Sequence, residues 1–134
     1  MILGIDPGAR RFGVAIADLE TRFARPLEVV DVQEHDPIER IKELVAENDV
    51  EKVVVGRPVT LAGVLGKSAE QQKSFLVALR SVLEIEVDVY DERMTTVIAE
   101  RNLRDAGMST KKMKSVKDAV AAQVMLQGYL DSRA

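Results

Sequence analysis

Short apolar runs along the chain predict five strands, and longer stretches with apolar residues every three or four positions predict four helices. Most of these runs end at residues that favour turns, such as glycine, proline and aspartate. The predicted strands cover residues 2–5, 12–17, 27–32, 53–55 and 87–90, and the predicted helices cover residues 37–47, 68–83, 96–106 and 115–131.

The order of these elements predicts an α/β fold. Three successive strands separated only by turns indicate an antiparallel meander, and two later strands reached through helices add in parallel. The unbroken β-branched run Val53–Val55 is typical of a central parallel strand that helices cover on both faces. We therefore expect one domain over residues 1–134, with a mixed five-stranded sheet and helices on both faces.

Acidic side chains stand at two of the predicted strand ends. Asp6 follows the first strand and precedes Pro7-Gly8, whereas Asp91 and Glu92 follow the fifth. Each has an ordinary explanation, as the side chain of an Asx turn or as a solvated acid. The carboxyl ends of parallel strands, however, gather at one edge of an open sheet, where ligands bind. Because neighbours in a strand point to opposite faces, we expect only one of Asp91 and Glu92 to reach the site of Asp6.

A third acid, Asp118, precedes a segment rich in alanine. Ser115 and Asp118 match a capping box, which predicts that the last helix begins there. The small side chains of Ala119, Ala121 and Ala122 would let this helix approach the sheet closely. Such a helix could hold Asp118 against the tip of the first strand.

Three carboxylates without a counter-charge would repel one another, and at least one of them would tend to protonate. A hard divalent cation removes this conflict, because Mg²⁺ and similar ions prefer oxygen ligands. Two such ions about 4 Å apart can activate a water and stabilise the leaving oxygen of a phosphodiester. This chemistry needs no histidine, and the single histidine, His35, lies in a polar turn where we expect ordinary surface.

The composition narrows the possible functions further. Without cysteine the chain carries no thiol nucleophile, zinc–thiolate site or iron–sulfur cluster. No apolar run is long enough to cross a membrane and no signal-peptide pattern opens the sequence, so we expect a cytoplasmic protein. The net charge of −3 argues against a nucleic-acid partner, but residues 51–134 hold 13 bases against 11 acids. A local basic patch is therefore compatible with the composition.

Four stretches resemble motifs of the YqgF family, also called the RuvX family of Holliday junction resolvases. The stretch Asp91-Glu-Arg-Met-Thr-Thr96 is the most specific of them. The others are Gly4-Ile-Asp-Pro-Gly8 with Arg10, Gly13-Val-Ala15 and Asp18, then Gly56-Arg-Pro58 with Gly63, and finally Lys117-Asp-Ala-Val-Ala-Ala122.

The resemblance covers nearly the whole chain and implies a ribonuclease H-like fold. It also implies a nuclease site with two Mg²⁺ or Mn²⁺ ions and a role in processing the pre-16S ribosomal RNA. By motif it assigns catalysis and metal binding to Asp6, Glu92 and Asp118. Related junction resolvases place their second acid at the tip of the fourth strand, where this chain has Gly56 and Arg57. Glu92 would therefore substitute for that acid.

Basic and hydroxyl side chains near these acids suit a phosphate backbone. Arginine can hold phosphate bidentately, and lysines add the charge that drives nucleic-acid binding. Aromatic residues make up only 4% of the chain, so we expect little base stacking. The candidate nucleic-acid contacts are Arg10, Arg57, Arg93, Thr95, Thr96, Lys111, Lys112 and Lys114, of which the lysines form, with Lys117, a predicted basic loop before Asp118.

Several alternatives stay open from the sequence. The substrate is precursor ribosomal RNA or four-way junction DNA; the protein is a monomer or a homodimer, and a junction resolvase needs a symmetric dimer. A phosphate site of the sugar-kinase and chaperone ATPase type needs two domains, more than 134 residues supply. Outside the enzymes, a module that docks on RNA or ribosomal particles with a vestigial site would have no reason to bind Mg²⁺ or Mn²⁺.

Overall fold

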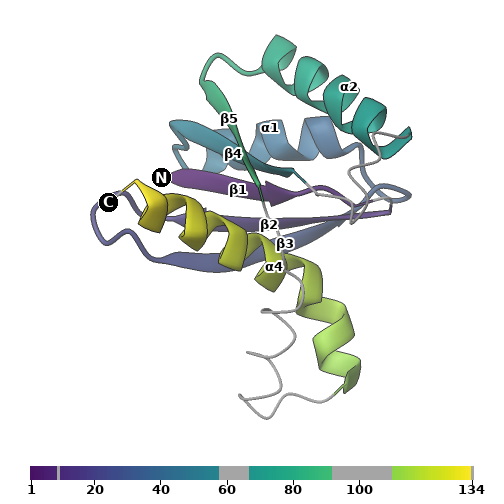
Figure 1. Cartoon of the computed structure of the whole chain (residues 1–134). Coiled ribbons are helices and arrows are strands. Elements are labelled where there is room, and N and C mark those ends of the chain that lie inside the picture. The colour runs from purple at the N-terminus through teal and green to yellow at the C-terminus, as the bar shows by residue number, and fades with distance from the viewer. Residues whose placement is uncertain (9, 58–66, 92–109, 134) are drawn as a thin grey trace.

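The computed structural model describes residues 1–8, 10–57, 67–91 and 110–133, which form a mixed sheet with helices packed on it (Figure 1). The strand order in the sheet is β3-β2-β1-β4-β5. The first three strands in the chain pair antiparallel, β1 with β2 and β2 with β3. The other two pairs are parallel, β1 with β4 and β4 with β5. The predicted meander with two added parallel strands is thereby confirmed. The strands are β1 (Ile2–Asp6), β2 (Arg11–Ala17), β3 (Ala24–Asp31), β4 (Lys52–Arg57) and β5 (Glu86–Asp91), and the helices are α1 (Pro37–Glu47), α2 (Lys67–Val82) and α4 (Thr110–Ser132).

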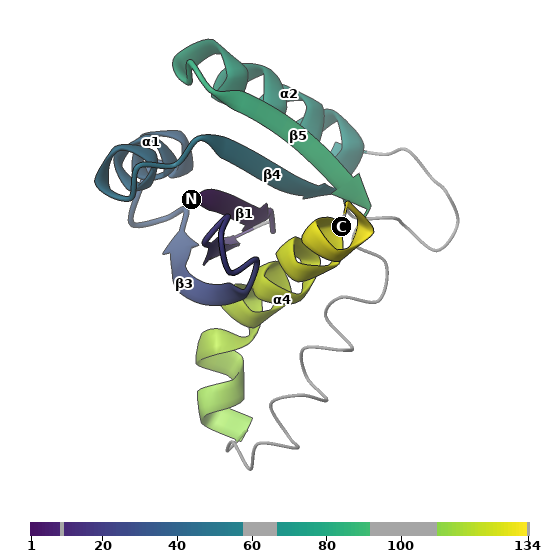
Figure 2. The same cartoon turned by 90° about the vertical axis from the view of Figure 1, so that its left-hand side faces the viewer.

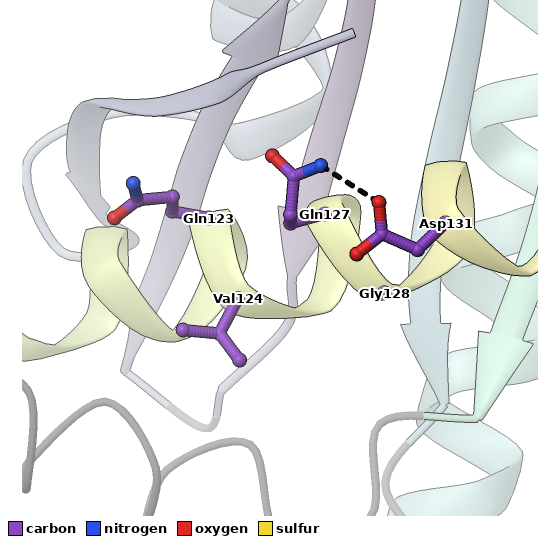
Figure 3. A pocket seen from close by; sticks show the side chains of 5 residues that line it. All are labelled: Gln123, Val124, Gln127, Gly128 and Asp131. Atoms are coloured by element: carbon purple, nitrogen blue, oxygen red, sulfur yellow. Dashed lines mark hydrogen bonds between the residues drawn. The ribbon is translucent and has the colours of Figure 1, made fainter.

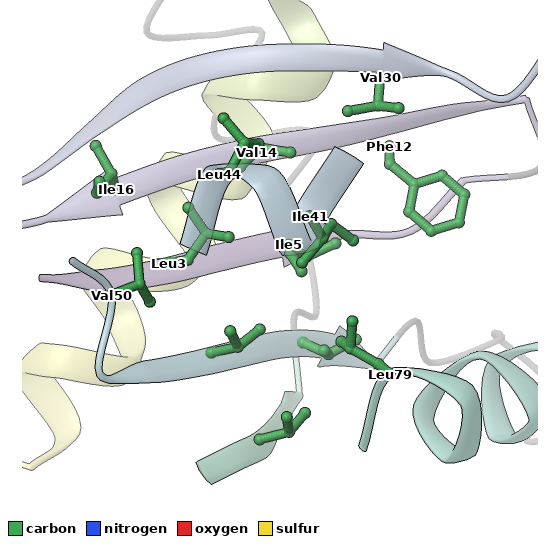
Figure 4. Close-up of a cluster of buried hydrophobic side chains, with 13 residues drawn as sticks. Leu3, Ile5, Phe12, Val14, Ile16, Val30, Ile41, Leu44, Val50 and Leu79 are labelled. Carbon is green, nitrogen blue, oxygen red and sulfur yellow. The ribbon is translucent and has the colours of Figure 1, made fainter. Parts of the chain in front are cut away.

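Helices cover both faces of the sheet, with α1 and α2 on one side and α4 on the other (Figure 2). Alternate residues of each strand supply the two cores, as the period of two in a strand requires. Toward α1 and α2 the sheet buries large aliphatic side chains, which pack on Ile41, Leu44 and Leu79 (Figure 4). Toward α4 it buries smaller ones, such as Ala15 and Ala17. The α4 helix can therefore lie close to the sheet. No described helix is long and apolar enough to cross a membrane.

The predicted boundaries hold for α1 and differ for β3. The Asp36 carboxylate accepts hydrogen bonds from the amides of Ile38 (2.9 Å) and Glu39 (3.4 Å), so α1 begins where the Asp-Pro pair indicates. Strand β3 begins at Ala24, three residues before the prediction. Pro26 obscured that start, because proline is tolerated in a strand only where its missing N–H does not matter, and β3 is an edge strand.

The start of α4 corrects two predictions. This helix begins at Thr110, so Ser115 lies inside it and the predicted capping box at Ser115–Asp118 is wrong. The predicted basic loop is wrong for the same reason, since Lys111, Lys112 and Lys114 are positions in the first turns of α4. Lysine and methionine are good helix formers, and no glycine or proline interrupts residues 110–118. The helix predicted over 96–106 lies outside the described residues.

Hydrogen bonds on both sides of α4 hold its C-terminal half against the sheet. Gln127 accepts a hydrogen bond from the Ala24 amide (2.8 Å) and donates one to the Arg22 carbonyl (3.0 Å). On the other side of the helix, the buried Tyr129 donates its hydroxyl to Asp88 of β5 (2.9 Å). These contacts fix α4 along the sheet and so fix the position of its preceding turns.

The Asp88 contact depends on pH. Burial alone would raise the pKa of Asp88, but hydrogen bonds from the Tyr129 hydroxyl and the Val89 amide, together with Lys52 and Arg133, lower it below its ordinary value of 3.8. The folded state therefore favours the ionised carboxylate. Its contribution to stability is present above the unfolded pKa and is lost as the pH falls through the lowered, folded pKa.

Replacing Asp88 with asparagine should lower the free energy of unfolding at neutral pH by about 1 kcal/mol, because a charged hydrogen-bond acceptor is lost. The difference from wild type should shrink below pH 3.8, where wild type also loses the charge. Urea denaturation at several pH values measures both effects. Glu86, 3.5 Å from Lys52 but 68% exposed, provides the control, and Glu86→Gln should cost less than about 0.5 kcal/mol. A pH-independent deficit in Asp88→Asn would contradict the assignment.

Candidate active site at the carboxyl edge of the sheet

Asp6 is the last residue of β1 and is half-buried. Strand alternation places it with Ile2 and Gly4 on the side of the sheet that α4 covers. The approach of α4 is already tight at Gly4, where a Cβ atom would lie 2.9 Å from Cβ of Leu126. Buried neighbours on β1 thus fix the position of the Asp6 backbone, and its carboxylate emerges on the α4 side of the sheet.

Gly13 brings α4 to the same point. It is the β2 partner of Asp6 in the antiparallel ladder, so the Cα atoms of the two residues are about 4.5–5.5 Å apart. A Cβ atom on Gly13 would overlap the main-chain carbonyl of Asp118 and would lie 3.1 Å from the Ala119 nitrogen. The backbone of α4 therefore rests directly on Gly13, and Asp118 sits over the strand pair that ends in Asp6.

Asp118 belongs to the stripe of α4 that faces the sheet. Ala122, Met125 and Tyr129 follow it at four, seven and eleven positions, which is the spacing of one helix face, and all three are buried. Asp118 itself is half-buried. The fold thus brings the segments that carry Asp6 and Asp118 together, although more than a hundred residues separate them in the chain.

The other parallel strands end at the same edge. In their register, Ile5 pairs with Val55 and Val55 with Val89, so β1, β4 and β5 run level to their carboxyl ends. Two interstrand spacings of about 4.8 Å separate β5 from β1. The tip of β4 is Gly56 and Arg57, as expected, and the Gly56 carbonyl accepts a hydrogen bond from Gln72 of α2 (2.7 Å).

The structure describes only some of the remaining predicted site residues. Arg57, paired with Asp91 across β4 and β5, is placed by its backbone. Glu92, Arg93, Thr95 and Thr96 lie outside the described residues, and Lys111, Lys112 and Lys114 are placed only as positions in α4.

Arg10 has a partner that the sequence analysis did not single out. Its Nε atom lies 3.5 Å from a carboxylate oxygen of Asp31, the last residue of β3. Asp31 also accepts a hydrogen bond from the Gln33 amide (2.9 Å). Asp31 follows the same pattern as Asp6, an acid that ends a strand at this edge, and that signal could have found it. Gly13 also carried a signal, because glycine inside a strand often marks the close approach of another backbone.

The donor set at this edge suits a hard cation. Asp6 and Asp118 offer only oxygen ligands, from a strand tip and from a helix held against that strand pair, and Mg²⁺ or Mn²⁺ prefers such ligands. Within the described ranges, no group of three or more histidine, aspartate or glutamate side chains is arranged to hold a metal ion. The third predicted ligand, Glu92, is not among those ranges. Asp6 and Asp118 are therefore ligands of the kind that such an ion prefers.

A pocket of about 370 Å³ lies elsewhere, against the later turns of α4 (Figure 3). Its lining begins five residues after Asp118, and Gln127 donates a hydrogen bond to Asp131 one turn farther along the helix (3.1 Å). The side chains that line it offer one carboxylate among amide and apolar groups; they are Gln123, Val124, Gln127, Gly128 and Asp131. The candidate site is therefore the strand edge and not this pocket.

Sequence comparisons identify similar proteins over the whole chain. Residues 1–132 match the model of the family RuvX, described as Holliday junction resolvase. A protein of Chloroflexus aggregans named "Putative pre-16S rRNA nuclease" is 47% identical over 135 residues, which cover 98% of this chain and 94% of that protein. A protein of Bacillus cytotoxicus with the same name is 43% identical, with 98% of each chain covered.

Structural comparison identifies two solved proteins of the same architecture. T. thermophilus RuvC in complex with a Holliday junction substrate superposes with a TM-score of 0.60 at 20% identity, over 98% of this chain and 94% of that one. Fowlpox virus resolvase with Holliday junction DNA gives 0.59 at 8% identity, over 98% and 97% of the two chains. These similarities confirm the predicted ribonuclease H-like fold.

Proposed function

Because this chain belongs to the RuvX family, we propose that it is a nuclease that hydrolyses phosphodiester bonds in the precursor of 16S ribosomal RNA. One observation supports the proposal: the α4 backbone rests on Gly13, which pairs with Asp6, so the segments that carry two acids distant in sequence lie together at the strand edge. The relatives named for pre-16S rRNA support the choice of substrate. The protein would act in the cytoplasm on RNA or ribosomal particles, as one nuclease domain over residues 1–134.

We assign Asp6, Glu92 and Asp118 as the residues that hold divalent cations, Mg²⁺ or Mn²⁺. A bound pair of such ions supplies an activated water and stabilises the leaving oxygen of the phosphodiester. The chain contributes the geometry. Strand β1 fixes Asp6, and contact with Gly13 fixes Asp118. The mutual repulsion of these acids is what makes the site selective for a cation.

Between the two adjacent acids we favour Glu92 over Asp91. Asp88 and Tyr90 of β5 contact α4 residues, so even-numbered positions of this strand face the side of Asp6. If the period of two continued past the end of β5, a side chain at position 92 would share the side of Asp6, which is the basis of this choice. Glu92→Gln should therefore lower cleavage far more than Asp91→Asn, as measured by initial rates on the same RNA.

Phosphate contacts would surround this site. The first turns of α4 extend beyond the sheet (Figures 1 and 2), and positions 111 and 114 precede Asp118 by seven and four residues, the spacing of one helix face. Lysines at these positions would add positive charge on the approach to the acids. We propose the same role for Lys112, Arg57, Arg93, Thr95 and Thr96.

A second candidate function is resolution of four-way DNA junctions. It is favoured by the likeness to two resolvases solved with junction DNA and by the name of the family model. Two symmetric incisions require two active sites related by a two-fold axis, so this function needs a homodimer, whereas RNA cleavage can be done by a monomer.

Cleavage assays with matched substrates separate these functions. The purified protein should cut a precursor RNA that contains a 16S end in Mn²⁺ or Mg²⁺, and excess chelator should abolish the cut. A four-way DNA junction and a duplex of the same arms should be cut much more slowly. Preferred cutting of the junction by a dimer would overturn the RNA assignment. Binding of the RNA without cleavage and without Mn²⁺ uptake in calorimetry would indicate a docking module instead.

A further inference from the structure

Two consecutive arginines, Arg10 and Arg11, precede the candidate site, and the structure gives them different surroundings. Arg11 is the first residue of β2 and pairs with Asp31 of β3. The next residue, Phe12, packs toward α1 and α2, and Gly13 touches α4. Strand alternation therefore puts Arg11 on the α4 side, the side on which Asp6 and Asp118 lie.

Arg11 also lies within reach of Asp6. Because Asp6 pairs directly with Gly13, Arg11 is its diagonal neighbour on the same face of the β1–β2 pair. Diagonal neighbours in an antiparallel pair are about 7–8 Å apart, a distance that long side chains span. The guanidinium of Arg11 can therefore reach a phosphate held beside Asp6.

The two guanidinium groups differ in their partners. Arg10 directs its Nε atom at Asp31, which lies 3.5 Å away. The Arg11 side chain is exposed and forms no hydrogen bond or ion pair with another residue of the described ranges. An exposed arginine beside acids that attract metal ions is available for a phosphate, which it can hold through two hydrogen bonds.

We propose that Arg11 is a phosphate-binding residue of this nuclease, and that Arg10 serves mainly to hold the end of β3 through Asp31. The inference rests on the proposed function and adds a contact that the sequence analysis did not assign. The sequence predicts a nucleic-acid contact for Arg10 and none for Arg11, whereas we expect Arg11 to contribute more to binding than Arg10.

The test compares Arg11→Ala with Arg10→Ala, which removes the same charge one residue away. Binding of fluorescently labelled single-stranded RNA is measured by anisotropy in chelator at several salt concentrations, so that cleavage does not interfere. Arg11→Ala should weaken binding about fivefold or more and reduce the salt slope by about 0.7, the value for one phosphate contact on a single strand. Arg10→Ala should change the slope by less than half as much.

The charge-preserving variant Arg11→Lys should keep the salt slope, because lysine also neutralises a phosphate. Thermal unfolding of each variant checks that the fold is intact. Equal losses in the two alanine variants, or wild-type binding by Arg11→Ala, would overturn the inference even if wild type cleaves RNA. A wild-type protein that neither binds nor cuts RNA or DNA would instead overturn the proposed function.

Discussion

Replacing Asp6 with asparagine should reduce RNA cleavage by more than about 100-fold, a larger loss than removal of a residue that only supports a metal ligand. Asparagine has nearly the same shape, so β1 and its ladder with β2 should be retained. What is lost is the charge that attracts a cation to the strand edge. Single-turnover cleavage in Mn²⁺ measures the rate, and calorimetric titration with Mn²⁺ measures the cation affinity without any need for turnover.

A matched control is available at the other end of the same strand pair. Asp18 follows β2 at the opposite edge of the sheet, where its carboxylate accepts a hydrogen bond from the Glu20 amide (2.7 Å). Asp18→Asn makes the same chemical change there and should leave both the rate and the Mn²⁺ affinity as in wild type. Cleavage by Asp6→Asn at the wild-type rate would refute the assignment of Asp6.

A double variant tests whether Asp6 and Asp118 act as one unit. If both hold the same cations, either single replacement removes the site, and Asp6→Asn with Asp118→Asn should be no slower than the worse single variant. If the fold-loss of cleavage rate in the double variant equalled the product of the two single losses, the two residues would have independent roles. This distinction matters because the structure joins the two residues through the backbone at Gly13.

The strands were predictable because their signals are local. The run Val53–Val55 and the alternation in residues 12–17 each follow from burial on one or both faces, which acts on every residue of the strand. The start of α4 was not predictable in this way, because a Ser-x-x-Asp pattern inside a helix has the same sequence as one that caps a helix. Only the surrounding chain decides between them, and here good helix formers continue the helix back to Thr110.

The approach of α4 to the end of β1 was only partly predictable from the sequence. Acids at the ends of strands, together with alanines in the last helix, indicated that Asp6 and Asp118 would meet. The contact that brings their two segments together, between the backbones of Gly13 and Asp118, depends on how closely α4 packs on the sheet. The pairing of Arg10 with Asp31 depends on the register of β2 and β3, which includes a shift between Val14 and Ala15. Such distant contacts leave no periodic signal in the sequence.

The contact at Gly13 makes the second strong prediction: Gly13→Ala should impair both stability and cleavage. The added Cβ atom would overlap the carbonyl group of Asp118, which is backbone and cannot rotate away as a side chain can. The helix must therefore shift. Overpacking of this kind typically costs about 1–3 kcal/mol, which for a chain of this size lowers the Tm by several degrees. Because the shift moves Asp118, cleavage at 25 °C should fall at least tenfold in protein that is still folded.

Gly128→Ala makes the same substitution farther along α4 and provides the control. A Cβ atom there would lie 3.3 Å from the Tyr90 hydroxyl, a side-chain atom that must move by only a few tenths of an ångström, and alanine favours a helix over glycine by about 1 kcal/mol. This variant should match wild type in cleavage and equal or exceed it in Tm. If Gly13→Ala lost stability but kept the wild-type rate per folded molecule, α4 could move without disturbing the chemistry. Asp118 would then have no part in the site, and the acids of the strand edge would have to suffice without it.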